Sequence, residues 1–258
     1  MPKLNVLITG STGYIGIQLI KLLIKHKNIN IKYLCGNSSA GKKISSYDTS
    51  LKSKKLPRIT KYNKKYLSYV DIIFTALPNG EAQLISKDLL KKNTLIDLAA
   101  DFRLNKASDY LKWYKQKHKA LSNIKNSIYA LPEITGKLVK KFSIIGCPGC
   151  YPTSILLPLI PLVKKRSINL KNIIIDSKSG YSGAGRGVHK KFKNKNLYES
   201  LSAYGVGFHR HNSEIDQELK NNSSSKINFT FTPHIIPMFR GILSTCLLYT
   251  SDAADEER

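Results

Sequence analysis

Acidic residues, cysteines and long apolar runs are scarce in this chain. Its 258 residues include 17 Asp and Glu against 42 Lys and Arg, for a formal net charge of +25. No apolar run reaches the roughly 18 residues that a membrane-spanning helix needs. Only four cysteines occur and no secretory leader precedes them, which predicts free thiols in a reducing, cytoplasmic compartment. The length suits two domains.

The positive charge raises the hypothesis of a nucleic-acid-binding protein. The lysines, however, are spread along the whole chain and the arginines are few. Nucleic-acid readers gather arginines and stacking aromatics in a local patch. Lys, Asn and Ile are also the residues of A/T-rich codons, so a biased genome explains the charge equally well. We therefore predict an anionic small-molecule substrate, and neither nucleic acid nor a membrane as a partner.

Strand-like and helix-like segments alternate along the first part of the chain. Such alternation predicts an α/β fold with a doubly wound parallel sheet. Residues 36–66 are polar and are expected to lie on the surface. The expected strands, taken from apolar and β-branched runs, are residues 3–9, 29–35, 69–76, 94–98, 128–131 and 142–145, followed by 172–177 and 227–232.

A glycine-rich turn follows the first expected strand. Gly10 would allow the tight turn, Gly13 would let the backbone approach a pyrophosphate, and Gly16 would let the next helix pack on the strand. An ordinary strand-to-helix turn is the alternative. The residues predicted to contact a dinucleotide here are Gly10, Ser11, Thr12, Gly13, Tyr14 and Gly16.

The residues after the second expected strand indicate whether the cofactor is NAD or NADP. An NAD enzyme often places Asp or Glu there for the ribose hydroxyls. This chain has hydroxyls and lysines instead, including Ser38, Ser39, Lys42 and Lys43. These groups suit a 2′-phosphate, so NADP is favoured over NAD, with Ser38 and Lys42 as the predicted contacts.

Cys150 follows a sharp turn, Gly146 to Gly149, at the end of an expected strand. Pro152 suits the first turn of a helix, so Cys150 should lie at or just before a helix N-terminus. That position favours the thiolate, which is the nucleophilic form. A small buried apolar side chain is the alternative. Cys147 adds C-x-x-C spacing, which leaves a dithiol oxidoreductase as a rival of another class.

His209 and His211 lie two residues apart in the second half of the chain. Either could be the base that a nucleophilic cysteine needs. Either could also be a surface residue. No further spaced pair of Cys or His accompanies them, so we predict no metal site.

Several ordered segments together closely resemble the N-acetyl-γ-glutamyl-phosphate reductases, the acyl-phosphate reductases of arginine biosynthesis. The resemblance runs from residue 3 to about residue 246. The segments are GSTGYIG (10–16), ALPNGEA (76–82), IDLAADFRL (96–104), LPEI (131–134), PGCYPTS (148–154), KSGYSGAGR (178–186), HRHNSEI (209–215) and FTPHIIPMFRGI (231–242).

The resemblance implies a Rossmann-type NADP-binding domain, residues 1–149, and an α+β catalytic and dimerisation domain of the semialdehyde-dehydrogenase type, residues 150–250. It implies Cys150 as nucleophile and His211, in preference to His209, as acid/base. It implies that Arg103, Arg186 and Glu214 line the substrate pocket. The implied reaction is NADPH-dependent reduction of N-acetylglutamyl 5-phosphate to the semialdehyde, by a homo-oligomer when full length. A related aminoadipyl- or aspartyl-phosphate reductase remains an alternative.

The chain departs from the family pattern in three places. Cys147 stands where the family usually has a polar residue such as asparagine. Ser213 stands where it usually has proline, which is expected to loosen the loop of His209 to His211. Beyond residue 246 the match ends, and residues 251–258 form an acidic tail that we expect to be non-native. The resemblance thus predicts a C-terminally truncated chain.

Overall fold

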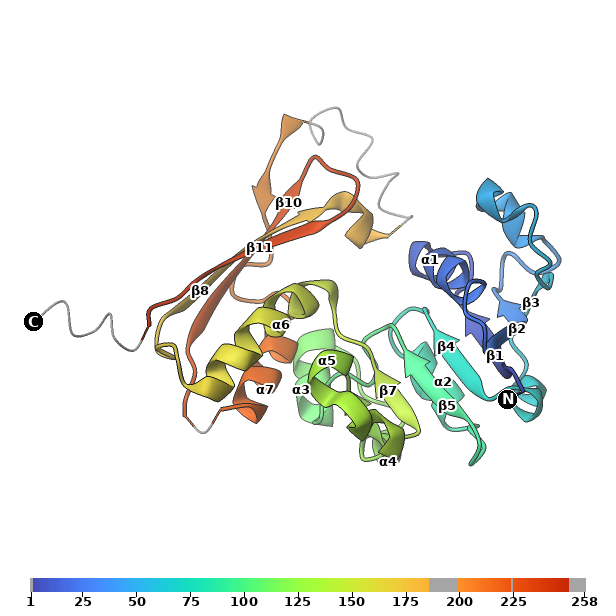
Figure 1. Cartoon of the computed structure of the whole chain (residues 1–258), viewed down its shortest axis with the longest axis horizontal. Coiled ribbons are helices and arrows are strands. Elements are labelled where there is room, and N and C mark those ends of the chain that lie inside the picture. Colours follow the sequence, from blue (N-terminus) through green and yellow to red (C-terminus); the bar gives the residue numbers. More distant parts are fainter. Residues whose placement is uncertain (1, 186–198, 224, 251–258) are drawn as a thin grey trace, which may run out of the picture. The chain divides into compact units, whose positions relative to one another are not determined.

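The computed structural model describes residues 2–185, 199–223 and 225–250 (Figure 1). The chain divides into two compact units, Met1–Cys147 and Pro148–Arg258. The predicted substrate residue Arg186 and the acidic tail, residues 251–258, lie outside the described residues.

The first unit is built on a seven-stranded parallel sheet with strand order β3-β2-β1-β4-β5-β7-β6. The predicted doubly wound sheet is confirmed. The order reverses between β1 and β4, where α/β proteins bind ligands beyond the carboxyl ends of the strands. The strands are β1 (Leu4–Thr9), β2 (Ile29–Cys35), β3 (Ile59–Thr60), β4 (Ile72–Thr75), β5 (Thr94–Asp97), β6 (Ser127–Tyr129) and β7 (Ile144–Gly146).

Both faces of this sheet are buried, as parallel sheets require. Val6 and Ile8 point to one face and pack with Ile17 of the first helix. Leu7 points to the other face and packs with Ala82. The helices are α1 (Tyr14–Leu23), α2 (Glu81–Ser86), α3 (Ala107–Tyr114), α4 (Leu121–Ile124) and α5 (Pro132–Thr135), with 3₁₀ turns at Ile44–Ser46, Thr49–Leu51, Lys64–Tyr69 and Gly136–Lys141.

Residues 36–66, expected to lie on the surface, also contribute side chains to the core and a strand to the sheet. Ile44, Leu51 and Ile59 are buried in the same core as α1, and β3 extends the sheet next to β2. Two 3₁₀ turns each contribute a single apolar residue to this core. With one apolar residue in each turn, the sequence shows no helical or strand-like hydrophobic periodicity here. The pattern therefore predicts surface and misses these buried side chains.

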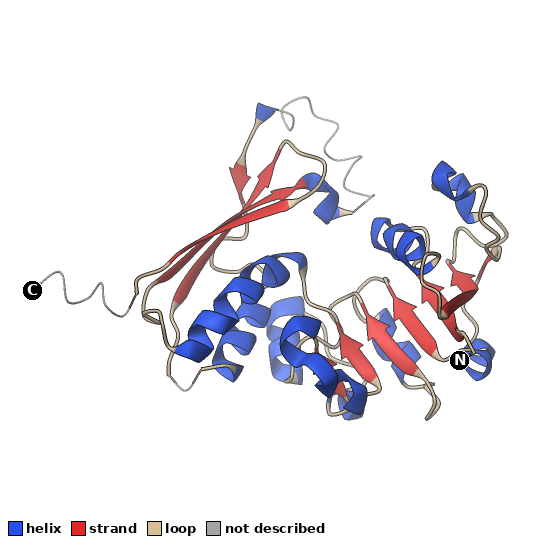
Figure 2. Cartoon of the chain, viewed as in Figure 1, coloured by secondary structure: helices blue, strands red, loops and turns tan. Residues whose placement is uncertain are grey.

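The second unit contains a four-stranded mixed sheet with strand order β11-β8-β10-β9. Figure 2 draws its strands in red. β8 and β10 run parallel, and the two outer pairs are antiparallel. The expected strands at 172–177 and 227–232 are present, while β9 and β11 were not predicted. The elements are β8 (Ile173–Gly180), β9 (Ser202–Ala203), β10 (Phe229–Ile236), β11 (Ile242–Leu247), α6 (Cys150–Lys165), α7 (Asn212–Asn221) and a 3₁₀ turn at Tyr181–Ala184.

Among the described residues, helices pack on one face of this sheet and not on the other. Ser154 of α6 bonds to Ser244 of β11, which bonds to Ser177 of β8, each pair 2.7 Å apart. On the opposite face Leu243 and Leu247 of β11 are exposed. The inner face thus carries α6, and on the outer face the described part of this unit leaves Leu243 and Leu247 exposed.

Helix α6 is 16 residues long and begins at Cys150. It contains Pro158 and Pro161, and it ends at Arg166 in the left-handed conformation, φ +54°. A helix of this length is shorter than a bilayer core. Within residues 2–185, 199–223 and 225–250, no helix is long and apolar enough to span a membrane.

Candidate active site

Cys150 is the first residue of α6 and is exposed. Gly149 precedes it in extended conformation and caps the helix. The first turn of a helix presents backbone N–H groups that have no partner within the helix, and the helix dipole is positive there. The predicted position of this thiol at a helix start is therefore what the structure shows, in a setting that favours a thiolate.

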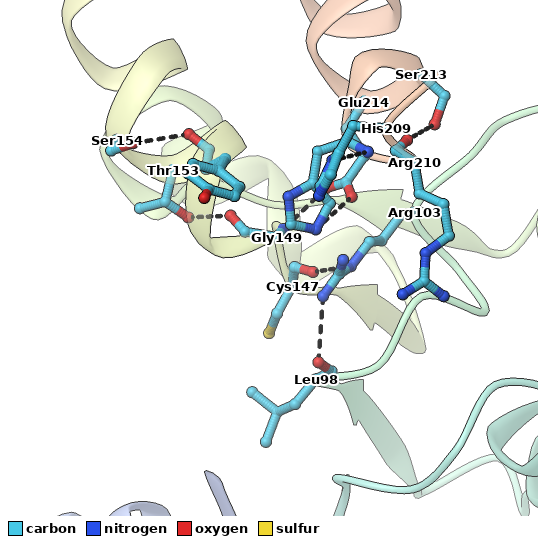
Figure 3. A network of polar contacts seen from close by, with 12 residues as sticks. Leu98, Arg103, Cys147, Gly149, Thr153, Ser154, His209, Arg210, Ser213 and Glu214 are labelled. Carbon is cyan, nitrogen blue, oxygen red and sulfur yellow. Dashed lines mark hydrogen bonds and ion pairs between the residues drawn. The ribbon is translucent and has the colours of Figure 1, made fainter. Parts of the chain in front are cut away.

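Glu214 ties the start of α6 to the start of α7. Its side chain is fully buried, and its Oε2 accepts a hydrogen bond of 2.8 Å from the backbone N–H of Gly149 (Figure 3). Its other oxygen lies 3.8 Å from Nε2 of His211, a contact that becomes an ion pair when the imidazole is protonated. A carboxylate thus fixes the residue before Cys150 and faces a histidine.

His211 lies against Gly149. A Cβ atom at Gly149 would come within 2.5 Å of His211 Nε2, so only glycine allows the ring this close to the backbone before Cys150. His211 is also the capping residue of α7. The imidazole therefore lies beside Gly149, the residue that precedes the nucleophile and caps its helix.

His209 is engaged differently. Its Nδ1 accepts a hydrogen bond of 3.1 Å from the backbone N–H of His211. Burial, followed by the nearby charge of Arg210, lowers the pKa of His209 to about 4. The ring is therefore neutral near pH 7, and one of its two nitrogens is already used by the backbone.

Tyr151 is a residue that sequence reasoning missed. Its ring makes edge contacts with His209 at 5.5 Å, His211 at 5.8 Å and Phe231 at 5.3 Å between centroids. Its hydroxyl donates to the carbonyl of His234. Tyr151 thereby holds both histidines next to α6. A tyrosine following a cysteine carries no signal of this in the sequence.

Ser213, which stands where the family pattern usually has proline, makes two hydrogen bonds within the histidine loop. Its hydroxyl donates a 2.6 Å hydrogen bond to the carbonyl of Arg210. Its backbone N–H donates to the same carbonyl at 3.2 Å. The serine thus closes the turn between the two histidines and the helix α7.

The glycine turn of residues 10–16 connects β1 to α1 in the first unit. Gly10 has φ +66°, and a Cβ there would collide with the carbonyl oxygen of Ala76. A Cβ at Gly16 would collide with the carbonyl of Gly10. Gly13 caps α1, so the turn leaves an N-terminal helix end at the carboxyl edge of the sheet. These are the features that a pyrophosphate site needs.

The other residues predicted to contact a dinucleotide differ in how exposed they are. Ser11 is buried, and its hydroxyl donates to the carbonyl of Cys35, so it shapes the turn. Thr12 and Tyr14 are half-buried, while Ser38 and Lys42 are exposed after β2.

Ser39 and Arg58 complete the loop after β2. Ser39 is buried, unlike its neighbour Ser38. Arg58, which the sequence did not single out, donates a 3.0 Å hydrogen bond to the carbonyl of Gly41. The loop after β2 therefore carries an anchored cation as well as Lys42.

Arg103 is buried in the first unit and bonds to two backbone carbonyls. Its Nε donates to Cys147 at 2.7 Å, and its Nη2 donates to Leu98 at 3.2 Å (Figure 3). These bonds fix the guanidinium at the carboxyl ends of β5 and β7.

Cys147 and Cys150 differ despite their C-x-x-C spacing. Burial, reinforced by the charge of Asp97, raises the pKa of Cys147 to about 11. Cys150 is exposed, and both are free thiols. A half-buried thiol that resists ionisation does not suit a dithiol oxidoreductase. Among the described residues, no group of three or more His, Cys, Asp and Glu could hold a metal ion.

Two family models match this chain. The semialdehyde dehydrogenase NAD binding domain matches residues 5–142, and the semialdehyde dehydrogenase dimerisation domain matches residues 150–258. The chain therefore contains an NAD(P)-binding domain of this type, followed by the dimerisation domain of the same enzymes.

Solved structures show the same fold. Aspartate semialdehyde dehydrogenase II of Vibrio cholerae matches with a TM-score of 0.68 at 15% identity, over 97% of this chain and 75% of that one. Aspartate semialdehyde dehydrogenase with NADP from Candida albicans matches with a TM-score of 0.64 at 17% identity, over 95% and 71%. At these identities the likeness concerns the fold.

Curated relatives are much more similar in sequence. The N-acetyl-gamma-glutamyl-phosphate reductase of Desulforamulus reducens is 40% identical over 251 residues, 94% of this chain and 70% of its own length. A probable chloroplastic enzyme of the same name from Arabidopsis thaliana is 41% identical over 238 residues, and the chain spans 59% of its length. By these matches the chain belongs to the N-acetyl-γ-glutamyl-phosphate reductase family of semialdehyde dehydrogenases.

Proposed function

We propose that this chain reduces N-acetyl-L-glutamyl 5-phosphate to N-acetyl-L-glutamate 5-semialdehyde and phosphate, with NADPH as the reductant, in arginine biosynthesis. The observation that carries the proposal is the exposed thiol of Cys150 at the start of α6, with His211 against the preceding residue. The names of the relatives support the substrate.

The first step uses the thiolate of Cys150. Its sulfur forms a bond to the acyl carbon of the substrate, and the bond between that carbon and the phosphate oxygen breaks. Inorganic phosphate leaves and a thioester remains on the cysteine. The N-terminal end of α6 stabilises the thiolate that begins this step.

The second step converts the thioester to the aldehyde. When bound, NADPH supplies the hydride for the acyl carbon. Hydride addition turns the thioester carbonyl oxygen into an oxyanion. His211 is our candidate to donate a proton to this oxygen and to take it back as the carbon–sulfur bond breaks and the semialdehyde leaves. The thiolate is then regenerated for another cycle.

His211 suits proton transfer better than His209. His209 is neutral near pH 7 and gives Nδ1 to a backbone N–H. His211 faces the buried carboxylate of Glu214, with His211 Nε2 3.8 Å from Glu214 Oε1, so the two form an ion pair when the imidazole takes up a proton. We therefore propose His211 as the acid/base and His209 as a neighbour that holds its backbone.

Glu214 is better suited to positioning than to substrate binding. It is fully buried and already accepts the Gly149 N–H. We propose that it fixes the backbone before Cys150 and orients His211. Arg103 and Arg186 remain our candidates for the anionic groups of the substrate.

The glycine turn fits a dinucleotide. Two of its glycines leave no room for a Cβ, and α1 begins where the pyrophosphate would rest. We propose NADP in preference to NAD, because Ser38 and Lys42 are exposed after β2 and Arg58 is anchored on the same loop. A cation at this place accommodates a 2′-phosphate.

We further propose that the full-length protein is a homo-oligomer. The match to a dimerisation domain supports this. The exposed leucines on the outer sheet face, Leu243 and Leu247, are an apolar surface that a second copy could cover. Free thiols at all four cysteines agree with the reducing cytoplasm as the compartment.

The test follows NADPH formation in the reverse direction, from the semialdehyde, inorganic phosphate and NADP⁺. Turnover is expected with N-acetylglutamate semialdehyde, and preference for aspartate semialdehyde would replace the proposal with the related reductase. Cys150→Ser should lower turnover by about a thousandfold or more. Cys246→Ser, which changes a half-buried thiol of β11 that has no role in the proposed reaction, serves as the control. Equal turnover of the two variants would refute the role of Cys150.

A further inference from the structure

Asp97 is a fully buried carboxylate at the carboxyl end of β5. Its Oδ1 accepts hydrogen bonds from the Thr75 hydroxyl at 2.7 Å and from the Ala99 N–H at 3.1 Å. Its Oδ2 accepts from the Asp101 N–H at 3.0 Å. Three donors thus converge on one side chain, and two of them belong to the loop of residues 98–102.

This loop leads directly to Arg103. Arg103 donates to the carbonyls of Leu98 and Cys147. The backbone N–H of Cys147 donates in turn to the carbonyl of Asp97 at 2.8 Å. The bonds therefore close a ring that runs from Asp97 through the loop to Arg103, and back through Cys147. Both carbonyls that hold the guanidinium depend on Asp97, one through its carboxylate and one through its backbone.

We propose that Asp97 is a positioning residue that sets the guanidinium of Arg103 for the anionic substrate, an inference that rests on the proposed function. Asp97 itself contacts neither substrate nor cofactor in this account. Its two carboxylate oxygens fix the loop backbone, and the loop fixes the arginine. The ionised carboxylate is the active form, because all three of its partners donate hydrogen bonds to it.

The electrostatic surroundings make this role sensitive to pH. Burial, followed by the charge of Asp101, raises the pKa of Asp97 to about 6, against the hydrogen bonds of Thr75 and Ala99 and the charge of Arg103. The titratable groups around it are Asp101, Arg103 and the thiol of Cys147. Protonation as the pH falls through about 6 removes an acceptor and loosens the loop.

Asp97→Asn is the first test, because an amide keeps the shape but replaces one acceptor with a donor. Facing the Asp101 N–H, that donor cannot bond. We expect the KM for the semialdehyde to rise about tenfold with a smaller change in kcat, the effect of weakening one charge-assisted contact. The Nε–H of Arg103, followed by NMR and assigned with Arg103→Lys, should exchange faster.

Asp71→Asn is the control. The Asp71 carboxylate also accepts a backbone N–H, that of Asn5 at 2.8 Å, but Asp71 precedes β4 and so lies at the opposite end of the strands from Arg103. A merely structural role for Asp97 predicts that both variants lose thermal stability and change KM alike. Positioning predicts that only Asp97→Asn changes KM and the Arg103 exchange. Equal effects would overturn the proposal.

Thr75→Val keeps the test decisive if Asp97→Asn fails to fold. Loss of the hydroxyl donor disfavours the ionised carboxylate, so the acidic limb of the pH dependence of kcat/KM should move to higher pH. An unmoved limb would contradict the proposal. The Arg103 Nε–H signal is read without substrate, so a parent protein that shows no reductase activity would refute the proposed function and leave the test of Asp97 intact.

Discussion

The glycine turn of residues 10–16 and the histidine segment of residues 209–214 are held in place by different kinds of contact. The turn works mainly through backbone groups: the Gly13 N–H donates to the Gly10 carbonyl, the Ser11 N–H donates to the Cys35 carbonyl, and a helix follows at once. The histidine segment works through side chains whose partners are distant in sequence. Glu214 bonds to Gly149, 65 residues earlier, and His209 packs against Tyr151 and Phe231.

This difference separates two kinds of mutation. In the turn, an altered residue deforms the backbone, and both stability and dinucleotide binding suffer. In the histidine segment, the fold is held by many partners, so a single side chain can lose its chemical role while the unit stays folded. The variants below test that separation.

Among the variants of these two segments, His211→Asn should have the largest effect on turnover. Loss of an acid/base group typically costs about a hundredfold to ten-thousandfold in rate, and the neighbours of His211 remain in place. His209→Asn is the matched control, since its Oδ1 can still accept the His211 N–H. We expect the control to lose much less. Steady-state kcat of the two variants decides between them, and a larger loss in His209→Asn would reverse the assignment.

Glu214→Gln sharpens the same comparison. The amide keeps an acceptor for the Gly149 N–H but removes the charge that faces His211. We expect kcat to fall about tenfold, with the pH dependence of kcat displaced, because the protonated imidazole loses its partner. A change in KM alone would instead support the substrate-binding role that the sequence predicted.

Gly10→Ala should act through the fold of the first unit. The new methyl group would meet the Ala76 carbonyl, and alanine disfavours φ +66°. Together these effects are expected to cost on the order of 3 kcal/mol of stability. Thermal unfolding and NADPH fluorescence titration measure the loss. Gly41→Ala, also at positive φ but with no atom within 4 Å of a Cβ, separates backbone strain from the collision.

The sequence predicted most of the first unit because its strands are continuous apolar runs. β2 has the predicted bounds, Ile29–Cys35. β3 and β9 contain two residues each and exist only through pairing with β2 and β10. β11 was also missed. Its side chains alternate between half-buried and exposed positions, and serine and threonine at its centre weaken the apolar pattern.

The sequence was enough to predict which residues form the candidate site. It was much less able to predict which role each residue has. Cys150 is identified by its own turn, because glycine and proline shape the backbone locally. The two histidines are the same residue type two positions apart. Their difference arises from Tyr151, Glu214 and Gly149, which only the tertiary fold brings near them.

Arg58→Gln tests the cofactor preference at the far end of the dinucleotide. If Arg58 and Lys42 hold the 2′-phosphate, the Kd for NADPH should rise about tenfold and the Kd for NADH should not change. Fluorescence titration with both dinucleotides measures this. Equal weakening for both would mean that Arg58 supports only the loop, through its bond to the Gly41 carbonyl.

The smallest expected effect is on the acid stability of the histidine segment. The folded-state pKa of His209 is about 4, below its ordinary value of 6.5. In the unfolded chain His209 is protonated below about pH 6.5, whereas in the folded chain it stays neutral down to about pH 4. The free energy of unfolding therefore falls as the pH drops through that window. At pH 5 the loss should be about 1 kcal/mol, after allowance for partial exposure. His209→Asn removes this titration and keeps the acceptor for His211. Its melting temperature should fall less than that of the parent between pH 7.5 and pH 5, and parallel falls would show that His209 is protonated in the folded state.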